Sequence, residues 1–317
     1  MQSSMSVSLV LGSGGARGLA HIGVINYLEE NGYRIRSVAG ASMGALVGGI
    51  WAAGRLTDYT DWVLALTRFD VFKLLDFSFS WSGLIKGERI IELLRDLVGD
   101  RNIESLPISY TAVATDLDSG KEIWLNQGNL FDAIRASIAI PTFFTPHSYL
   151  GRRLVDGGLV NPVPIAPTLK DVTDLTIAVN LIGKASPEME DQPEPEPPPE
   201  DRLSTYQSRI RRFIDGLYKS EGRPEAPREE DELGLFDVLN RSFDTMQSTV
   251  AKLKLAAYTP DVVVEIPRNA CGMLDFFRAE EMISLGRRLA EEALGRRNGQ
   301  GRPALFPILS HIRQADS

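Results

Sequence analysis

The stretch that most constrains this chain runs from residue 38 to residue 54, where an apolar strand meets an almost wholly apolar helix through Gly40-Ala41-Ser42-Met43-Gly44. A serine fits so sharp a strand-to-helix turn only where the residues two positions to either side have no side chain to clash. Glycine at positions 40 and 44 meets that need. Ser42 is therefore a candidate nucleophile at a helix N-terminus, where free N–H groups favour developing negative charge. A serine that only caps the helix is the alternative.

A second glycine-rich loop, residues 12–18, follows an expected buried strand over residues 6–11 and leads into a helix. Its spacing does not match the dinucleotide-binding fingerprint, because the third glycine would fall at Arg17. The Gly-Lys-Ser/Thr ending of a phosphate-binding Walker loop is also missing. The functional interpretation that remains is an oxyanion hole, and a turn used only for close packing is the alternative.

In the oxyanion-hole interpretation, backbone N–H groups at a helix N-terminus face a tetrahedral intermediate. Arg17 either adds a fixed positive charge or braces the loop. Because the loop and Ser42 follow the two strands of one expected β-α-β unit, both should lie at the carboxyl edge of the sheet, where open α/β sheets bind ligands. The candidate donors are Gly14, Gly15 and Ala16.

Composition narrows the partners and the compartment of this 317-residue chain. Its formal net charge of −8 disfavours a nucleic-acid partner held by a general basic field. Cys271 is the only cysteine, which excludes an intrachain disulfide and a multi-cysteine metal site. No apolar run approaches the ~20 residues that span a bilayer, and no basic region precedes the first apolar run. We therefore expect a cytoplasmic protein without a signal peptide.

Large apolar and aromatic side chains crowd a poorly periodic stretch between Phe69 and Gly87. Packing in the core is one explanation for such a cluster. An apolar wall or lid over acyl chains is the other.

The second half of the chain offers another carboxylate in the turn Asp156-Gly157-Gly158, which by itself is an ordinary turn sequence. Beyond it, strands are expected over residues 175–181 and 262–266, and helices over 235–257 and 279–294. Six apolar residues fall on one side of the first of these helices. They are Phe236, Leu239, Phe243, Met246, Val250 and Leu253.

Residues 184–234 form an acidic, proline-rich insert that cannot build a core. Within it, Leu203–Lys219 has apolar residues at helical spacing, and the cations Arg209, Arg211 and Arg212. Such a segment either lies in a membrane interface near anionic headgroups, or packs on its own domain or on a second subunit. The expectation is thus peripheral contact with the inner membrane surface or a homo-oligomer. A weakly ordered tail is expected over residues 299–317.

Four motifs in their order and spacing resemble the bacterial type of patatin-like phospholipases. They are Gly-Ser-Gly-Gly-Ala-Arg-Gly at 12–18, Gly-Ala-Ser-Met-Gly at 40–44, the segment from Arg135 to Pro146, and Asp156-Gly157-Gly158. The resemblance covers most of residues 6–182 and continues from Asp275 to Gly286. It implies a three-layer α/β/α sandwich around a mainly parallel central sheet, as a single acyl hydrolase domain over residues 1–298.

For the site, the resemblance implies a Ser-Asp dyad that cleaves acyl esters of lipids, as a phospholipase A or lysophospholipase, without metal or organic cofactor. Ser42 matches the nucleophile and Asp156 the general base, while Gly14, Gly15 and Arg17 lie in the oxyanion loop. Many family members have alanine where this chain has Gly158. A general carboxylesterase or thioesterase, and a catalytically dormant lipid-binding or regulatory module, stay open as alternatives.

Dyad chemistry needs no histidine, since a partly desolvated Asp156 has a raised pKa and can accept the Ser42 proton directly. A Ser-His-Asp triad through His147 is the competing interpretation. The α/β-hydrolases have the chain order Ser, acid, His, whereas His147 precedes Asp156. Only His311 in the tail would then fit that order.

Overall fold

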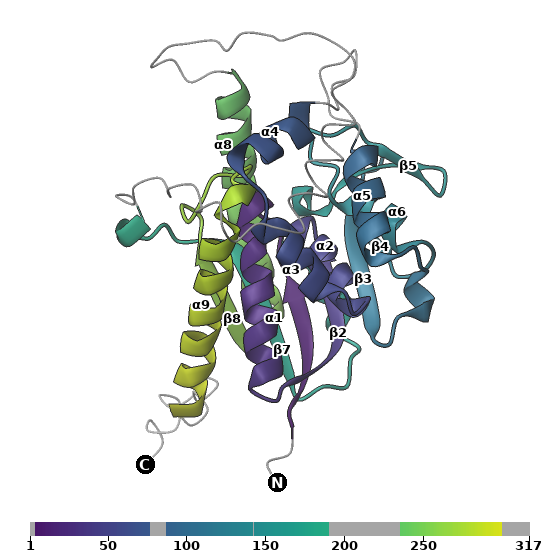
Figure 1. Cartoon of the computed structure of the whole chain (residues 1–317). Helices are drawn as coiled ribbons and strands as arrows, with labels where there is room; N and C mark the ends of the chain where they lie inside the picture. The colour runs from purple at the N-terminus through teal and green to yellow at the C-terminus, as the bar shows by residue number, and fades with distance from the viewer. Residues whose placement is uncertain (1–3, 77–86, 142, 190–234, 300–317) are drawn as a thin grey trace, which may run out of the picture.

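The computed structural model describes residues 4–76, 87–141, 143–189 and 235–299 (Figure 1). The amphipathic segment Leu203–Lys219 lies outside these ranges, as do most of the acidic insert and the tail after residue 299. Within them the strands are β1 (Ser6–Leu11), β2 (Arg34–Ala41), β3 (Ser109–Asp116), β4 (Glu122–Leu125), β5 (His147–Tyr149), β6 (Arg152–Asp156), β7 (Leu175–Gly183) and β8 (Val262–Pro267). The helices are α1 (Ala20–Glu30), α2 (Met43–Ala52), α3 (Leu56–Leu64), α4 (Arg68–Asp76), α5 (Glu88–Val98), α6 (Leu130–Ser137), α8 (Leu235–Tyr258) and α9 (Ala279–Gly299).

These strands form one mixed sheet in the order β5-β6-β3-β2-β1-β7-β8, and β4 pairs with β3. The pairings of β1 with β2 and β7, of β2 with β3, and of β7 with β8 are parallel. Antiparallel pairing is confined to β4, β5 and β6 at one end of the sheet. Strand β1 is buried on both faces, as its unbroken apolar run Leu9–Leu11 requires in a parallel sheet.

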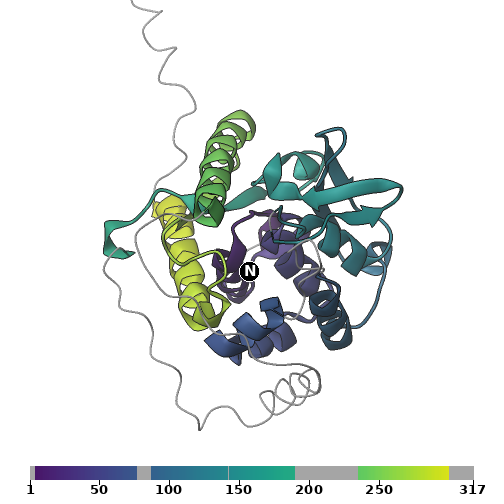
Figure 2. The ribbon, with the colours of Figure 1, turned by 90° about the horizontal axis from the view of Figure 1, so that it is seen from above.

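Helices cover both faces of the sheet. Leu9 and Leu11 of β1 face the core under α1, α2 and α9, whereas Val10 faces a second cluster with Ala251 of α8. Viewed from above, the green helix α8 lies on one side of the sheet and the blue helices α3 and α4 on the other (Figure 2). The prediction of a three-layer α/β/α sandwich around a mainly parallel sheet is confirmed.

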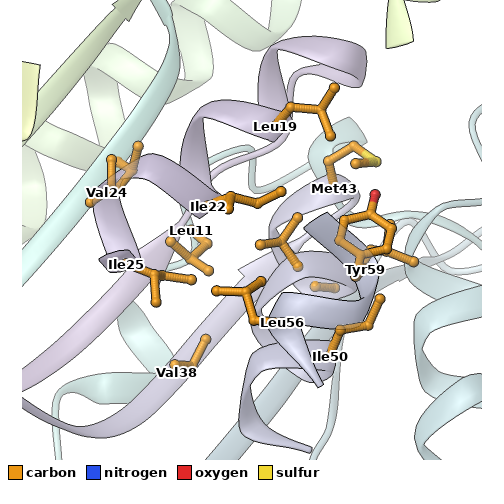
Figure 3. Close-up of a cluster of buried hydrophobic side chains, with 14 of the residues drawn as sticks. Leu11, Leu19, Ile22, Val24, Ile25, Val38, Met43, Ile50, Leu56 and Tyr59 are labelled. Carbon is orange, nitrogen blue, oxygen red and sulfur yellow. The ribbon is translucent and has the colours of Figure 1, made fainter. Parts of the chain in front are cut away.

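The main core lies directly beneath the candidate site. Ile22 and Ile25 of α1 point toward Leu11 of β1, and Leu56 of α3 closes the cluster beside α2 (Figure 3). Small residues let α2 approach the sheet closely, because a Cβ on Gly48 would lie 2.6 Å from a Val38 methyl. This packing fixes the N-terminus of α2, where Ser42 stands.

The sequence pattern predicts one amphipathic helix over residues 57–68, but in the structure that helix ends early. Helix α3 ends at Leu64, and α4 starts at Arg68 behind a capping box. In that box, the N–H and hydroxyl groups of Thr67 donate to Asp70 Oδ2, and the Asp70 N–H donates back to the Thr67 hydroxyl. Thr67 therefore begins a new helix where periodicity alone predicts that the first one continues.

The apolar side of α8 is partly exposed. Met246 is 55% exposed and Leu253 is 66% exposed, whereas Gln247, Ser248 and Ala251 are buried. The helix is turned this way because its inner face meets the polar glycine-rich loop as well as β7. Periodicity predicts the helix but does not identify Gln247 and Ser248 as buried.

Candidate active site

Ser42 stands at the junction of β2 and α2 with φ 55° and ψ −124°, a strained backbone for a residue with a side chain. The flanking glycines make the turn possible. A Cβ on Gly40 would lie 2.4 Å from the Gly44 carbonyl, and a Cβ on Gly44 would lie 2.0 Å from the Leu11 oxygen. The turn thus has the geometry of a nucleophile elbow, as the spacing predicts.

Ser137, at the end of α6, holds the elbow from the neighbouring element. Its buried hydroxyl accepts a hydrogen bond from the Ser42 N–H at 2.9 Å and donates one to the Val113 oxygen at 2.6 Å. The sequence places Ser137 in the motif from Arg135 to Pro146 but assigns it no role. Its contact partner is far away in the chain, so only the fold reveals this contact.

Asp156 ends β6, fully buried, and is fixed on three sides. Its N–H donates to the Ala139 oxygen at 2.9 Å, and the Thr115 hydroxyl donates to its carbonyl oxygen at 2.9 Å. Its carboxylate Oδ1 accepts the Gly158 N–H at 2.7 Å. Among the described residues, Oδ2 has no aligned hydrogen-bond partner. This oxygen is therefore free to accept a proton.

Burial raises the pKa of the Asp156 carboxyl to about 7, because the charged form loses its hydration. The Ser42 hydroxyl and the Gly158 N–H oppose this rise, so Ser42 lies near enough to act on the carboxylate. A pKa near neutrality suits a general base, which must be deprotonated yet basic at the working pH. The structure thus brings together the two residues that the resemblance pairs.

The glycine-rich loop offers two backbone donors rather than three. The Ala16 N–H donates to the Met273 oxygen at 2.8 Å, so the expectation that it serves an oxyanion hole is wrong for this conformation. In the described part of the chain, the N–H groups of Gly14 and Gly15 have no acceptor. Gly15 has φ 58° and lies in the wall of the same pocket as Ser42.

Arg17 braces this loop. Its side chain is only 2% exposed, and Nε donates to the Gly14 oxygen at 2.9 Å. Nη1 donates to the Arg268 oxygen at 2.7 Å, and Nη2 forms an ion pair with Asp244 at 3.2 Å. Every nitrogen of the guanidinium is thus used inside the protein, which favours the bracing role over a charge directed at substrate.

An apolar pocket opens beside Ser42. It encloses about 830 Å³ of empty space, including the part open to solvent. Apart from Ser42 and Gly15, large apolar and aromatic side chains line it. They are Met43, Leu46, Tyr59, Trp62, Leu66, Val71, Leu74, Ile90, Leu94, Ile138, Ile140, Phe143, Phe144, Met273, Leu274 and Phe276.

The aromatic-rich stretch contributes to this wall. Val71 and Leu74 of α4 line the pocket, whereas Phe69 is exposed, and residues 77–86 lie outside the described ranges. Across the pocket, the hydroxyl end of Tyr59 points toward Met43, the residue after Ser42 (Figure 3). Val71 and Leu74 thus pack against the core and also line the pocket, while a role as a wall for acyl chains stays a prediction.

A family model for patatin-like phospholipases matches residues 9–169, from β1 to just beyond the Asp156 turn. The chain belongs to the patatin-like phospholipase family. Membership places it among esterases and lipid acyl hydrolases.

Three proteins to which the chain is similar come from different organisms. An uncharacterized NTE family protein of Mycobacterium tuberculosis is 43% identical over 331 residues, with 92% of each chain covered. The neuropathy target esterase sws of Drosophila persimilis is 34% identical over 166 residues, which are 50% of this chain and 12% of that protein. The crystal structure of VipD from Legionella pneumophila has 14% identity and a TM-score of 0.49, covering 92% of this chain and 67% of that one.

Close packing explains why glycine stands at position 158 of this patatin-like domain. A Cβ at this position would lie 2.3 Å from Gln247 Nε2 and 2.3 Å from the Ser13 hydroxyl. Gln247 of α8 and Ser13 of the glycine-rich loop therefore fill the space that a side chain at position 158 would need.

His21, at the start of α1, supports the glycine-rich loop from below. It is fully buried, and its Nε2 lies 2.9 Å from the Gly12 oxygen, to which the neutral ring donates. Burial lowers its pKa to about 4, with the Gly12 hydrogen bond opposing that effect. His21 is therefore a neutral structural donor at the pH where Asp156 titrates.

His21→Gln is expected to lose less folding stability than the parent as the pH falls. The unfolded chain protonates this histidine near its ordinary pKa of 6.5, while the folded chain resists until about 4. Stability from this group is thus present above pH 6.5 and lost as the pH falls toward 4, with about 2 kcal/mol lost by pH 5. Urea unfolding at pH 7 and pH 5 measures it, and an equal drop in both proteins would contradict the assignment.

Among the described residues, no cluster of three or more His, Cys, Asp and Glu side chains is arranged to hold a metal ion. None of the described helices combines the length and the apolar character that crossing a bilayer requires.

Proposed function

We propose that this protein is a serine acyl hydrolase that cleaves acyl esters of lipids, of the phospholipase A or lysophospholipase type. The observation that carries the proposal is the position of Ser42. It lies between an apolar pocket and the buried carboxylate of Asp156, beside the N–H of Gly15, which has no acceptor among the described residues. An acyl chain in the pocket would bring its ester carbonyl to Ser42.

In the first half-reaction, Ser42 Oγ attacks the ester carbonyl carbon and passes its proton to Asp156 Oδ2. The N–H groups of Gly14 and Gly15 stabilise the negative charge that develops on the carbonyl oxygen. Collapse of the tetrahedral intermediate breaks the bond to the alcohol, and Asp156 returns the proton to that leaving oxygen. The acyl group is then esterified to Ser42.

The second half-reaction repeats these steps with water. Asp156 accepts a proton from water as its oxygen attacks the acyl carbon, and the same N–H groups hold the oxyanion. The bond to Ser42 Oγ then breaks, Oγ takes the proton from Asp156, and the fatty acid leaves. Each proton that Asp156 accepts is returned in the same half-reaction, so the dyad ends the cycle unchanged.

A substrate panel tests the proposal. Fatty acid release from diacyl phosphatidylcholine, lysophosphatidylcholine, an acyl-CoA thioester and a p-nitrophenyl ester is measured for the parent and for Ser42→Ala. We expect the parent to release fatty acid from at least one phospholipid. Turnover of the p-nitrophenyl ester or thioester alone would assign a general esterase or thioesterase, and lipid binding without turnover would assign a dormant module.

Removing His147 is expected to leave activity within about three-fold of the parent, because a dyad needs no imidazole. His147 lies on the edge strand β5 and is absent from the lining of the pocket that holds Ser42. Steady-state hydrolysis of a soluble ester by His147→Ala measures this. A loss of several orders of magnitude in a folded variant would restore the triad.

A further inference from the structure

Helix α8 lies beyond the segment that the family model matches, yet it contacts the glycine-rich loop at two points. Asp244 and Gln247 are three residues apart, so their side chains share one face of the helix. Asp244 reaches Arg17, and Gln247 reaches Ser13. No catalytic motif in the sequence points to either residue.

The first contact connects Asp244, through Arg17, to the backbone of the glycine-rich loop. Asp244 Oδ1 binds Arg17 Nη2, and Arg17 Nε holds the Gly14 oxygen. The Gly14 carbonyl and the Gly15 N–H belong to one planar peptide group and point in opposite directions. Holding the Gly14 oxygen therefore fixes where the Gly15 N–H points.

The second contact links the glycine-rich loop to the turn that carries Asp156. Gln247 is 2% exposed, and its Nε2 donates to the Ser13 hydroxyl at 3.2 Å. The same Nε2 occupies the space above Gly158, whose N–H binds the Asp156 carboxylate. One side chain thus packs against the glycine-rich loop and against the turn that carries Asp156.

We propose that Asp244 and Gln247 are positioning residues for the reaction, and that α8 sets the orientation of the oxyanion donors relative to Ser42 and Asp156. Neither side chain touches the reacting atoms. This inference rests on the proposed function. It extends the functional site from the family segment, which ends at residue 169, to a helix that begins at Leu235.

Loss of positioning has a kinetic signature. The oxyanion exists only in the transition state, so misdirected N–H groups lower kcat and leave substrate binding nearly unchanged. Small misplacements cost up to about 100-fold in rate. We expect Asp244→Ala and Gln247→Leu to lower kcat on a soluble ester by about 10- to 100-fold, with KM within about two-fold of the parent.

Two variants supply the controls. Ser248→Ala alters a buried polar residue on the same helix that has no hydrogen bond to the glycine-rich loop among the described residues, and kcat should stay within about two-fold. Asp244→Asn keeps an oxygen that accepts from Arg17, and it should recover most of the activity that Asp244→Ala loses. Thermal unfolding of each variant shows whether it is folded at the assay temperature.

An inhibitor that forms an oxyanion distinguishes misplaced oxyanion donors from a general loss of structure at the site. A medium-chain trifluoromethyl ketone adds to the nucleophilic serine and leaves an oxyanion in the hole, whereas a fatty acid product occupies only the pocket. The inhibition constant of the ketone should rise in parallel with the loss of kcat, while that of the fatty acid stays constant. Equal increases for both ligands would assign Asp244 and Gln247 to stability alone and overturn the proposal.

Hydrogen exchange tests the positioning without any turnover. Amides in residues 12–19 should exchange faster in Asp244→Ala and Gln247→Leu than in the parent and in Ser248→Ala. Unchanged exchange in both variants would overturn the positioning role, even if the parent proved inactive. An active parent with unaffected variants would overturn this inference and leave the proposed function standing.

Discussion

Replacing Ser42 with alanine is expected to lower kcat for ester hydrolysis by roughly 10⁴- to 10⁶-fold, which is the loss that follows when a serine nucleophile is removed from a unit that acts with its base. Alanine has no Oγ to form the acyl-enzyme, and no described hydroxyl other than that of Tyr59 lies in the pocket lining. Release of p-nitrophenol and labelling by a fluorophosphonate measure turnover and nucleophile separately. Both should disappear.

Two comparisons exclude a folding defect. Ser248→Ala makes the same chemical change at another buried serine and should keep its activity and its labelling. Ser42→Gly also removes the hydroxyl, but it relieves the positive φ and should be about 1 kcal/mol more stable than Ser42→Ala. Labelling that persists in Ser42→Ala would place the nucleophile elsewhere.

The candidate site could be predicted from the sequence wherever the constraint is local. Gly40 is needed because a Cβ there would strike the backbone of Gly44 and Ala45, four and five residues away. That steric rule acts within one turn, so it can be recognised from the sequence of residues 40–44 alone. The same reasoning predicts the glycine-rich loop and the order of strand, loop and helix around it.

Contacts that close through space could not be predicted in this way. Ser137 holds the Ser42 N–H across 95 residues, and Gln247 reaches Ser13 across 234. Ala16 looks like a third oxyanion donor until the fold places the Met273 oxygen in front of its N–H. Each of these depends on which elements become neighbours, and periodicity carries no information about that.

Helix α8 illustrates the same limit in its orientation. Its apolar spacing predicts a helix over 235–257, close to the observed Leu235–Tyr258. Hydrophobic periodicity does not show which residues are buried, because the buried side carries Gln247 and Ser248, and Gln247 binds the polar loop. A helix that serves a site is packed partly by hydrogen bonds, and these do not register in an apolar pattern.

Asparagine at position 156 is expected to lower kcat by roughly 10⁴-fold, since an amide cannot accept the Ser42 proton. In the parent, kcat/KM should fall about ten-fold for each pH unit below the Asp156 pKa of about 7, because only the ionised carboxylate acts as base. Asp118→Asn, a surface substitution of the same kind, should leave the profile unchanged. A plateau extending well below pH 7 would assign the base to another group.

The same raised pKa predicts that Asp156→Asn gains folding stability relative to the parent as the pH rises. Between about pH 4 and 7, the unfolded chain has released the proton of this carboxyl while the folded chain retains it, so the parent loses stability as the pH rises through that window. Asparagine does not titrate. The stability of Asp156→Asn relative to the parent should therefore grow by a few kcal/mol from about pH 4 to pH 8, as measured by urea unfolding. A constant difference across that range would mean that burial does not destabilise the Asp156 carboxylate. The raised pKa that makes this carboxylate a base for Ser42 would then be absent too.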